Sequence, residues 1–413
     1  MSRDAEQPAE PTRRRLMGVD ATRGLALLGM MAVHVLPSTA SDGGVTTTYA
    51  ITGGRSAATF AVMAGVGLAL LTGGTRPVRG RAYGGAAAGL VVRAVCIGVV
   101  SLWLGLTDSH VAVILAYYAV LFLLAIPLLP LRATPLAAIG LAVAALVPVG
   151  SFILRGNRGL PFDGSNPTFR TLVDHPGSFP EGLLLTGYYP ALAWTAYVCA
   201  GLAAGRVGLR SRRTAAWLLG GGAALAVAAS VVSWLLLGPL GGRDEIAATV
   251  ADPARLDQAL EHGLFGNTPT TTWWWLAVDS PHSTTPLDLL QTIGSALALL
   301  GALLLVASSG RVPRVVLAPV AAAGTMTLSL YTGHVLLLGS GLLPDDRETS
   351  YFVQVIAALT FALVWRTFLG RGPLERLVAL AAAPARRAVS GRAPDREPAQ
   401  SLDLSEHGSA AGR

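Results

Sequence analysis

Residues 17–37 read MGVDATRGLALLGMMAVHVLP, an apolar stretch that is interrupted by three ionisable side chains, Asp20, Arg23 and His34. About twenty consecutive apolar residues are needed for a helix to cross the hydrocarbon core of a bilayer. Ionisable groups are costly to bury there, so each of them is a candidate for a functional role. This stretch therefore predicts a membrane protein and supplies its first candidate site residues.

Apolar segments of similar length recur along most of the chain, at roughly 56–72, 83–105, 111–129, 133–154, 182–204, 214–240, 287–308, 315–340 and 350–369. The chain is 52% hydrophobic and only 13% charged, whereas soluble proteins carry about 25% charged residues. We therefore predict an all-α fold, a polytopic membrane helix bundle of about ten transmembrane helices over residues 16–388. The polar segments 1–15 and 389–413 are expected to be disordered tails.

The positive charge is distributed as topology signals are. All 31 basic residues are arginines, and the net charge is +7. With the N-terminus inside, the predicted inner loops 73–82, 130–134, 205–213 and 309–314 hold ten arginines, and the much longer outer loops hold seven. This asymmetry predicts a multi-pass protein of the plasma membrane with both termini in the cytoplasm. Arginines scattered over short loops indicate lipid as the partner and argue against nucleic acid.

The three ionisable residues of the first segment share one helix face. Arg23 and His34 are eleven residues apart, which is nearly a whole number of turns, and Asp20 lies about one turn before Arg23. His34 is then about 16 Å further along the axis than Arg23. Asp20 and Arg23 form either a structural ion pair or a contact to an anionic cofactor. His34 is either a hydrogen-bonded interior histidine or a general base or acyl-accepting nucleophile.

Two further membrane segments carry candidates. His334 lies in the outer half of segment 315–340, at a depth similar to that of His34, so the two histidines could converge in one catalytic site. A polar stripe that packs against another helix is the alternative. Arg93 lies near the middle of its segment, where it needs a partner or a water-filled cavity, and we predict that it contacts phosphate.

Candidates for acceptor binding lie at the outer ends of segments. They are Arg55, His282 and Asp288, each of which could instead be a solvated loop residue. Cys96 and Cys199 lie in apolar runs, and no Cys/His spacing suggests a metal, so we expect no metal site.

The residues of the first two segments resemble a known family. The stretch 18–34 contains D-x-x-R-G, followed by a histidine eleven residues after the arginine. It resembles the first-helix motif of the heparan-alpha-glucosaminide N-acetyltransferase family. The runs GRSAATF (54–60) and MAGVG (63–67) resemble the second helix of that family. Further on, WRTF (365–368) and GPLER (372–376) look like a related bacterial membrane family of unknown function.

The resemblance implies a bacterial transmembrane acyltransferase that uses acetyl-CoA as co-substrate. In that family, acetyl passes from cytoplasmic acetyl-CoA to an amino sugar on the far side of the membrane. Asp20 and Arg23 would lie near the donor, and His34 near the transfer point. The eukaryotic enzyme has a histidine in its first outer loop, but residues 38–55 contain none. His34, His334 and His282 are the candidates to replace it.

The leading hypothesis is therefore transfer of an acetyl or other acyl group from cytoplasmic acyl-CoA to an extracytoplasmic glycan or amino-sugar acceptor. The main alternative is a proton-coupled small-molecule transporter or flippase, in which the same ionisable residues form a translocation path. A scaffold or sensor without chemistry is a third possibility. The sequence does not determine the oligomeric state and leaves a homodimer open.

Overall fold

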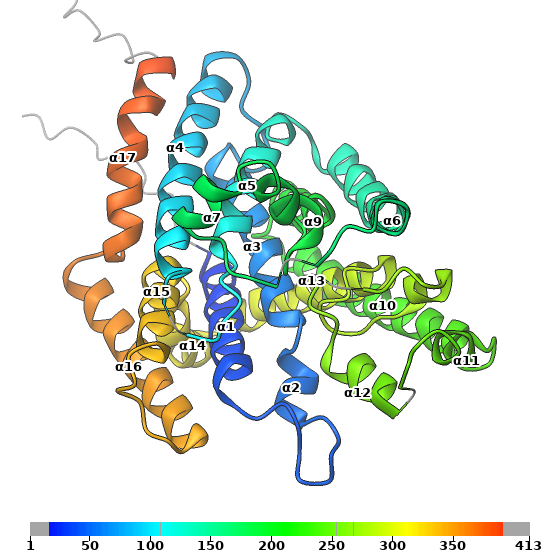
Figure 1. Cartoon of the computed structure of the whole chain (residues 1–413). Coiled ribbons are helices and arrows are strands. Elements are labelled where there is room, and N and C mark those ends of the chain that lie inside the picture. The colour runs from blue at the N-terminus through cyan, green and yellow to red at the C-terminus, as the bar shows by residue number, and fades with distance from the viewer. Residues whose placement is uncertain (1–15, 108, 163, 253, 267, 391–413) are drawn as a thin grey trace, which may run out of the picture.

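We analysed a computed structural model that describes residues 16–107, 109–162, 164–252, 254–266 and 268–390 (Figure 1). Within these residues every regular element is a helix, and the one extended feature is an isolated bridge between Thr39 and Val45. The prediction of an all-α fold is confirmed. The tail predicted for residues 1–15 lies outside the described residues, and so does the tail predicted for 389–413 apart from residues 389 and 390.

Twelve helices build the bundle: α1 (Met17–Val35), α3 (Arg55–Leu71), α4 (Gly80–Leu104), α5 (Leu115–Ala125), α6 (Ala133–Arg158), α9 (Ala191–Arg206), α10 (Arg212–Leu237), α13 (Pro286–Ser308), α14 (Arg311–Ala323), α15 (Thr327–Leu338), α16 (Arg347–Phe368) and α17 (Pro373–Ser390). Short connecting helices are α2 (Thr47–Thr52), α7 (Phe169–Asp174), α8 (Phe179–Glu181), α11 (Gly242–Ala247) and α12 (Ala254–His262). A π turn covers Gly182–Thr186, and 3₁₀ turns cover Ile126–Leu128 and Trp273–Ala277.

The helices are compatible with a membrane bundle, but the number of ten spans is not confirmed. Among the described residues, six helices are long and apolar enough to cross a membrane, or up to seven if a bent pair counts as one span. Every predicted segment contains a helix. However, the segment 111–129 forms an apolar helix of only Leu115–Leu128, and α9 has 16 residues. α1, which carries three ionisable side chains, is also not among the six.

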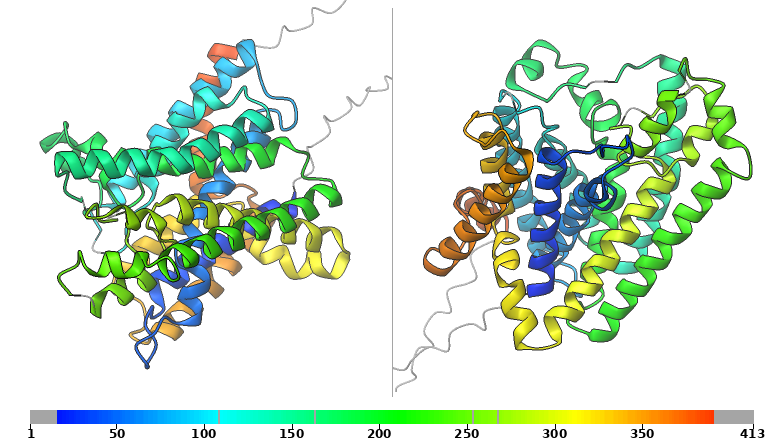
Figure 2. Two further views of the ribbon diagram at one scale, coloured as in Figure 1. Left: turned by 90° about the vertical axis from the view of Figure 1, so that its right-hand side faces the viewer. Right: turned by 90° about the horizontal axis from the view of Figure 1, so that it is seen from below.

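α1 lies at the centre of the bundle, where it contacts α3, α13, α14 and α16. Figure 2 shows α10 and α13 lying side by side, with α1 crossing them at an angle. Apolar side chains such as Leu27 and Met31 bury the helix on several sides. The helix ends at Val35, two residues before Pro37, because a proline disfavours helical geometry in the residue that precedes it. Asp20 and His34 therefore lie near opposite ends of a rigid central helix. The two ends of the bundle are called the Asp20 end and the His34 end.

The predicted segment 315–340 is not one straight helix. It is divided into α14 and α15, which meet at 65° across the short break at Gly324–Met326. Gly324 sits directly against the backbone of α1, where a Cβ atom would overlap the Asp20 carbonyl oxygen. The break thus lies beside the polar end of α1 and exposes backbone N–H groups at the start of α15.

The C-terminal segment of the bundle, α17, lies along α4 (Figure 1). It extends through Ser390, two residues beyond the predicted boundary at 388. Small residues on α4 allow the close approach, since Gly85 faces the carbonyl oxygen of Arg386. α17 is amphipathic and turns Val378 towards the interior while Leu377 and Leu380 are exposed.

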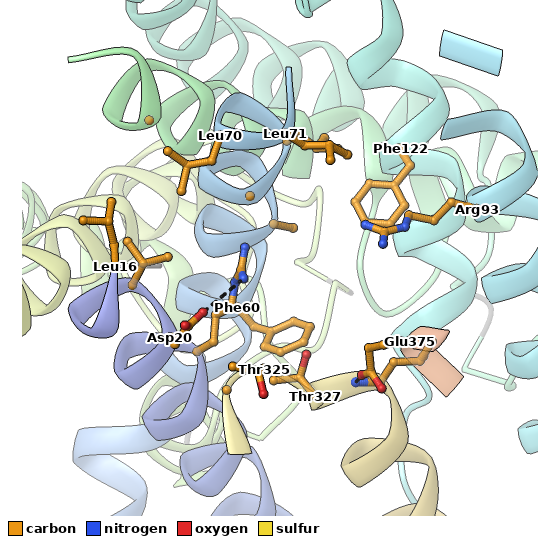
Figure 3. A pocket seen from close by; sticks show the side chains of 18 of the residues that line it. Leu16, Asp20, Phe60, Leu70, Leu71, Arg93, Phe122, Thr325, Thr327 and Glu375 are labelled. Carbon is orange, nitrogen blue, oxygen red and sulfur yellow. Dashed lines mark hydrogen bonds and ion pairs between the residues drawn. The ribbon is translucent and has the colours of Figure 1, made fainter. Parts of the chain in front are cut away.

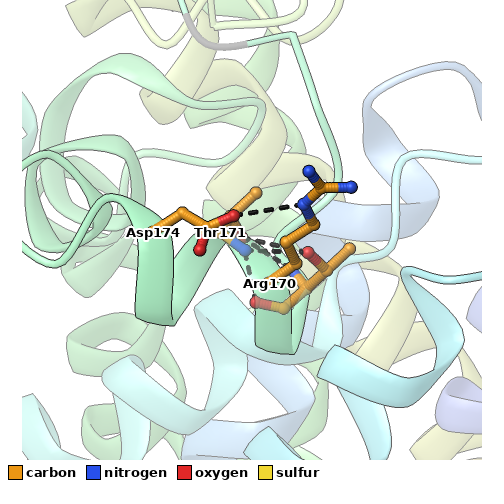
Figure 4. Close-up of polar contacts among 4 residues, drawn as sticks. Arg170, Thr171 and Asp174 are labelled. Atoms are coloured by element: carbon orange, nitrogen blue, oxygen red, sulfur yellow. Dashed lines mark hydrogen bonds and ion pairs between the residues drawn. The ribbon is translucent and has the colours of Figure 1, made fainter.

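The long connections contain local structure. In the connection that follows α6, Thr168 and Thr171 form a capping box at the start of α7, and Arg170 pairs with Asp174 one turn later at 3.1 Å (Figure 4). An exposed pair of this kind contributes under about 1 kcal/mol. The connection between α10 and α13 contains three consecutive tryptophans, of which Trp273 is strongly exposed and packs its ring on Phe152.

Candidate active site

Two histidines from opposite ends of the sequence meet inside the bundle. His34 on α1 and His334 on α15 approach to 3.1 Å between Nδ1 and Nε2, and their rings are nearly parallel, at 12°. His334 is buried and His34 is half-buried. Their similar depth left convergence open, and the structure brings the two rings into contact.

Gln354 on α16 contacts this pair and orients it. The Oε1 atom of Gln354 lies 2.7 Å from Nδ1 of His334, and its Nε2 atom faces the Ser350 hydroxyl at 3.3 Å. In this arrangement the amide oxygen faces the histidine and the amide nitrogen faces the serine. The Gln354 oxygen can only accept, so His334 donates from Nδ1 and accepts at Nε2. His34 must then donate from Nδ1, which leaves its Nε2 as an unprotonated base.

A cavity of about 770 Å³ lies in the part of the bundle that contains Asp20. Residues of the α3–α4 and α9–α10 connections, such as Gly74 and Gly208, border it at the Asp20 end. Tyr331 and Leu115 line it in the interior. Its volume is in the range of cofactor and small-molecule sites.

Cationic side chains line this cavity on two sides (Figure 3). On one side Arg23 pairs with Asp20 at 3.9 Å and donates to the Met63 carbonyl oxygen at 3.1 Å. The Arg23 guanidinium lies against Gly67 of α3, where any larger side chain would overlap it. Arg93 on α4 lies across the cavity from Asp20.

Arg93 differs from Arg23 in its partners. Among the described residues it makes no hydrogen bond or ion pair, and it interacts with Glu375 only at longer range. A mid-segment guanidinium that borders a cavity, without a carboxylate bound to it, is suited to an anionic ligand.

Glu375 on α17 is already engaged. Its carboxylate accepts hydrogen bonds from the backbone N–H groups of Leu328 and Ser329 at 2.7 and 3.2 Å, and from the Ser329 hydroxyl at 2.5 Å. These groups lie in the first turn of α15, where a negative charge also interacts favourably with the helix dipole. Glu375 therefore holds α17 against the broken helix and closes one wall of the cavity.

Arg206 has a role that sequence reasoning missed. It was expected in a polar loop, but it is buried at the end of α9. Its guanidinium donates to the carbonyl oxygens of Ala69, Thr72, Gly74 and Leu129 at 2.6–3.1 Å. It thereby fixes the α3–α4 connection at the cavity mouth. A planar group with five donors is the side chain able to bind so many carbonyls, but a sequence does not show that they converge.

The cavity and the histidine pair adjoin one another. Tyr331 lines the cavity, and His334 follows one helical turn later on α15. On α1, Asp20 and Arg23 line the cavity, while His34 lies about 16 Å further along the same helix. A ligand with an anionic part near the arginines could thus reach towards the histidines with its other end.

The remaining predicted site residues lie nearer the His34 end and make mainly structural contacts. The Arg55 guanidinium donates to the Ala50 carbonyl oxygen at 2.5 Å. Asp288 is buried in the first turn of α13 and accepts from the Thr284 N–H at 2.8 Å, while its own N–H donates to the side chain of the N-cap residue Thr285. Arg55 and Asp288 interact only at longer range. Their contact with an acceptor stays a prediction.

His282 is buried in the loop before α13, with a positive φ of 56°. Its ring stacks on Phe265 at 5.4 Å and meets Tyr189 edge-on at 5.7 Å. It lies near enough to His34 to interact electrostatically with it. Burial lowers the pKa of His282 from its ordinary value of 6.5 to about 4.

Within the described residues, no group of three or more His, Cys, Asp or Glu side chains is placed to hold a metal ion. No curated protein matches the chain.

A family model for the catalytic region of heparan-alpha-glucosaminide N-acetyltransferase matches residues 15–236, which is more than half of the 413-residue chain. The matched part runs from α1 to α10 and includes His34 and the cavity arginines, whereas His334 and Gln354 lie beyond it. The chain therefore belongs to the heparan-alpha-glucosaminide N-acetyltransferase family.

Proposed function

We propose that this chain is a transmembrane acyltransferase that binds acetyl-CoA in the arginine-lined cavity and passes the acetyl group to an acceptor at the His34 end. The observation that carries the proposal is the proximity of a cationic cavity to a histidine pair, in which the His34 Nε2 atom is left as a base. Family membership supports the acetyltransferase class.

In this proposal the donor enters from the cytoplasm. The arginine-rich connections, which include those at the cavity mouth, then lie at the inner face, and both termini are cytoplasmic. Arg23 and Arg93 bind the phosphates of the nucleotide, and the pantetheine arm extends along α1 towards Tyr331. The acceptor, a glycan or amino sugar, approaches from the outer face of the plasma membrane, near Arg55 and Asp288.

His34 then acts as the base. Its Nε2 removes a proton from the acceptor amine or hydroxyl, whose heteroatom attacks the thioester carbonyl carbon. The C–S bond breaks, and CoA leaves as the thiolate, which takes up the proton. The hydrogen bond to His334 stabilises the positive charge that His34 carries in between, and Gln354 holds His334 in the matching tautomer. General-base catalysis of this kind contributes about 10²- to 10⁴-fold.

The same nitrogen could also attack the thioester itself. An acyl-imidazole would then form on His34 as CoA departs, and the acceptor would take the acyl group in a second step. The two routes differ in whether acyl label remains on the protein when the acceptor is withheld.

Binding of CoA to the purified protein in nanodiscs tests the donor site. The change Arg93→Gln should raise the Kd for CoA about 10- to 100-fold, because hydrogen bonds to charged groups contribute about 1.5–3 kcal/mol. Arg132→Gln is the matched control, since Arg132 is exposed and does not line the cavity. A folded wild-type protein that does not bind CoA would contradict the proposal and favour the transporter alternative.

A further inference from the structure

Several buried polar side chains in the described part of the chain lack a hydrogen-bond partner, and Tyr118 is the one among them that lines the cavity. Tyr118 lies on α5 and lines the cavity, and the residue is 3% exposed. Within the described part of the chain its hydroxyl has no hydrogen-bond partner. Nearly all buried hydroxyls in native proteins are hydrogen-bonded, so an unpartnered one requires an explanation.

Aromatic neighbours fix the Tyr118 ring. Phe60 meets it edge-on at 5.4 Å, and Phe122 does so at 6.3 Å, and both of these residues line the cavity. A ring held from two sides has little freedom to turn its hydroxyl towards a distant partner. The position of the hydroxyl is therefore set by packing and not by a hydrogen bond of its own.

The position of Tyr118 along the cavity is also defined. Tyr331 lies close to Tyr118, and the Tyr331 hydroxyl accepts from the backbone N–H of Ile114, one turn before Tyr118 on α5. Tyr331 in turn precedes His334 by one helical turn. Tyr118 therefore belongs to the end of the cavity that faces the histidine pair, where the thioester of a bound donor would lie.

We propose that Tyr118 is a catalytic residue whose hydroxyl donates a hydrogen bond to the acyl oxygen of the thioester. The inference rests on the proposed acyltransfer. When the acceptor attacks the carbonyl carbon, the π electrons of the C=O bond move onto its oxygen, and the hydroxyl stabilises that charge without giving up its proton. The electrons return as the C–S bond breaks and the CoA thiolate departs.

The test compares Tyr118→Phe with Tyr197→Phe. Tyr197 is an equally buried tyrosine on α9 that bonds the Thr292 hydroxyl at 2.8 Å and does not line the cavity. Tyr118→Phe should lower the rate of acetyl transfer about 10²-fold, as the loss of an oxyanion donor does, and leave the Kd for CoA unchanged. Its Tm should equal or exceed that of wild type, because no hydrogen bond is lost. Tyr197→Phe should lower the Tm and leave the rate per folded molecule unchanged.

A purely structural role for Tyr118 predicts a different result. In that case Tyr118→Phe would transfer acetyl at the wild-type rate, or both variants would lose rate in proportion to their loss of Tm, and either outcome overturns the proposal. Isotope-edited infrared spectroscopy of bound [1-¹³C]acetyl-CoA gives a second readout. The carbonyl band should lie at lower frequency in wild type than in Tyr118→Phe, and equal frequencies would contradict the proposal. Wild-type protein that releases no CoA would instead overturn the acyltransfer itself.

Discussion

At the residue scale, the histidine pair depends on one uncharged side chain. Gln354 orients His334 through a 2.7 Å contact, and His334 orients His34 through a 3.1 Å contact. Counting turns along the two segments predicts a similar depth for His34 and His334, but it left open whether they meet, because their contact depends on how α1 and α15 pack. Gln354 was missed because its contact depends on how closely α16 approaches α15. The available signal was a polar side chain inside the apolar segment 350–369.

Removing the hydrogen-bond acceptor at position 354 should disturb the histidine pair without removing either histidine. Gln354→Met deletes the oxygen that selects the His334 tautomer, so we expect transfer to slow about 10-fold or more, a part of the effect of a general base. Gln354→Glu retains an acceptor and should restore part of the rate. Gln291→Met is the control, because Gln291 is buried on α13 and its hydrogen bonds among the described residues stay within that helix, to Ser295. Equal transfer rates in Gln354→Met and in the control would count against a role of Gln354 in orienting the histidine pair.

His282 should make the stability of the fold depend on pH. Its pKa falls from 6.5 to about 4 on folding, so between these values the unfolded chain binds more protons than the folded one. The neutral buried ring therefore contributes its full stability above pH 6.5 and loses it as the pH falls towards 4. At about 1.4 kcal/mol per pKa unit, the loss is roughly 3 kcal/mol.

Thermal unfolding in detergent between pH 4 and 7.5 measures this effect. His282→Asn is the suitable variant, since asparagine tolerates the positive φ of 56° at this position. The difference in Tm between wild type and His282→Asn should shrink as the pH is lowered through this window. A difference that stays constant with pH would contradict burial of a neutral ring.

At the element scale, the bent pair α14–α15 depends on close contact with α1. The apolar pattern of residues 315–340 predicted one straight helix, because hydrophobicity shows which residues are buried and not where a backbone bends. The bend is possible because Gly324 lets the break touch the α1 backbone at Asp20 and Gly24. Glu375 then satisfies the N–H groups that the bend exposes on α15. Such contacts between distant segments could not be predicted from local patterns.

The change Gly324→Ala tests this contact. The added methyl group would overlap the Asp20 carbonyl oxygen, so we expect a loss of about 1–3 kcal/mol in unfolding free energy. Gly333→Ala is the matched control on α15, where an added Cβ meets no atom within 4 Å. This control should be neutral or slightly stabilising, because alanine has the higher helix propensity. Equal thermal stabilities of the two variants would show that α1 and the break are not in close contact.

At the scale of the whole molecule, one central helix connects two chemical environments. Asp20 and Arg23 of α1 border the cationic cavity, and His34 lies beside His334 about three turns further on. Sequence periodicity predicted the shared face of α1 and its three polar residues. The cavity could not be predicted, because its walls come from α3, α4, α5, α15 and α17, which pack together only in the folded bundle. The position of a residue along a membrane helix can be predicted from the sequence, whereas the shape of a cavity between helices cannot.

The most direct measurement of the central claim is CoA release from acetyl-labelled acetyl-CoA by the protein in nanodiscs, with wild type and His34→Ala compared. We predict that wild type releases CoA and that His34→Ala releases it about 10²- to 10⁴-fold more slowly while still binding CoA. Label retained on wild-type protein without acceptor would identify the acyl-imidazole route. Equal release by the two proteins, both shown to be folded and to bind CoA, would contradict a catalytic role for His34 and with it the proposed site of transfer.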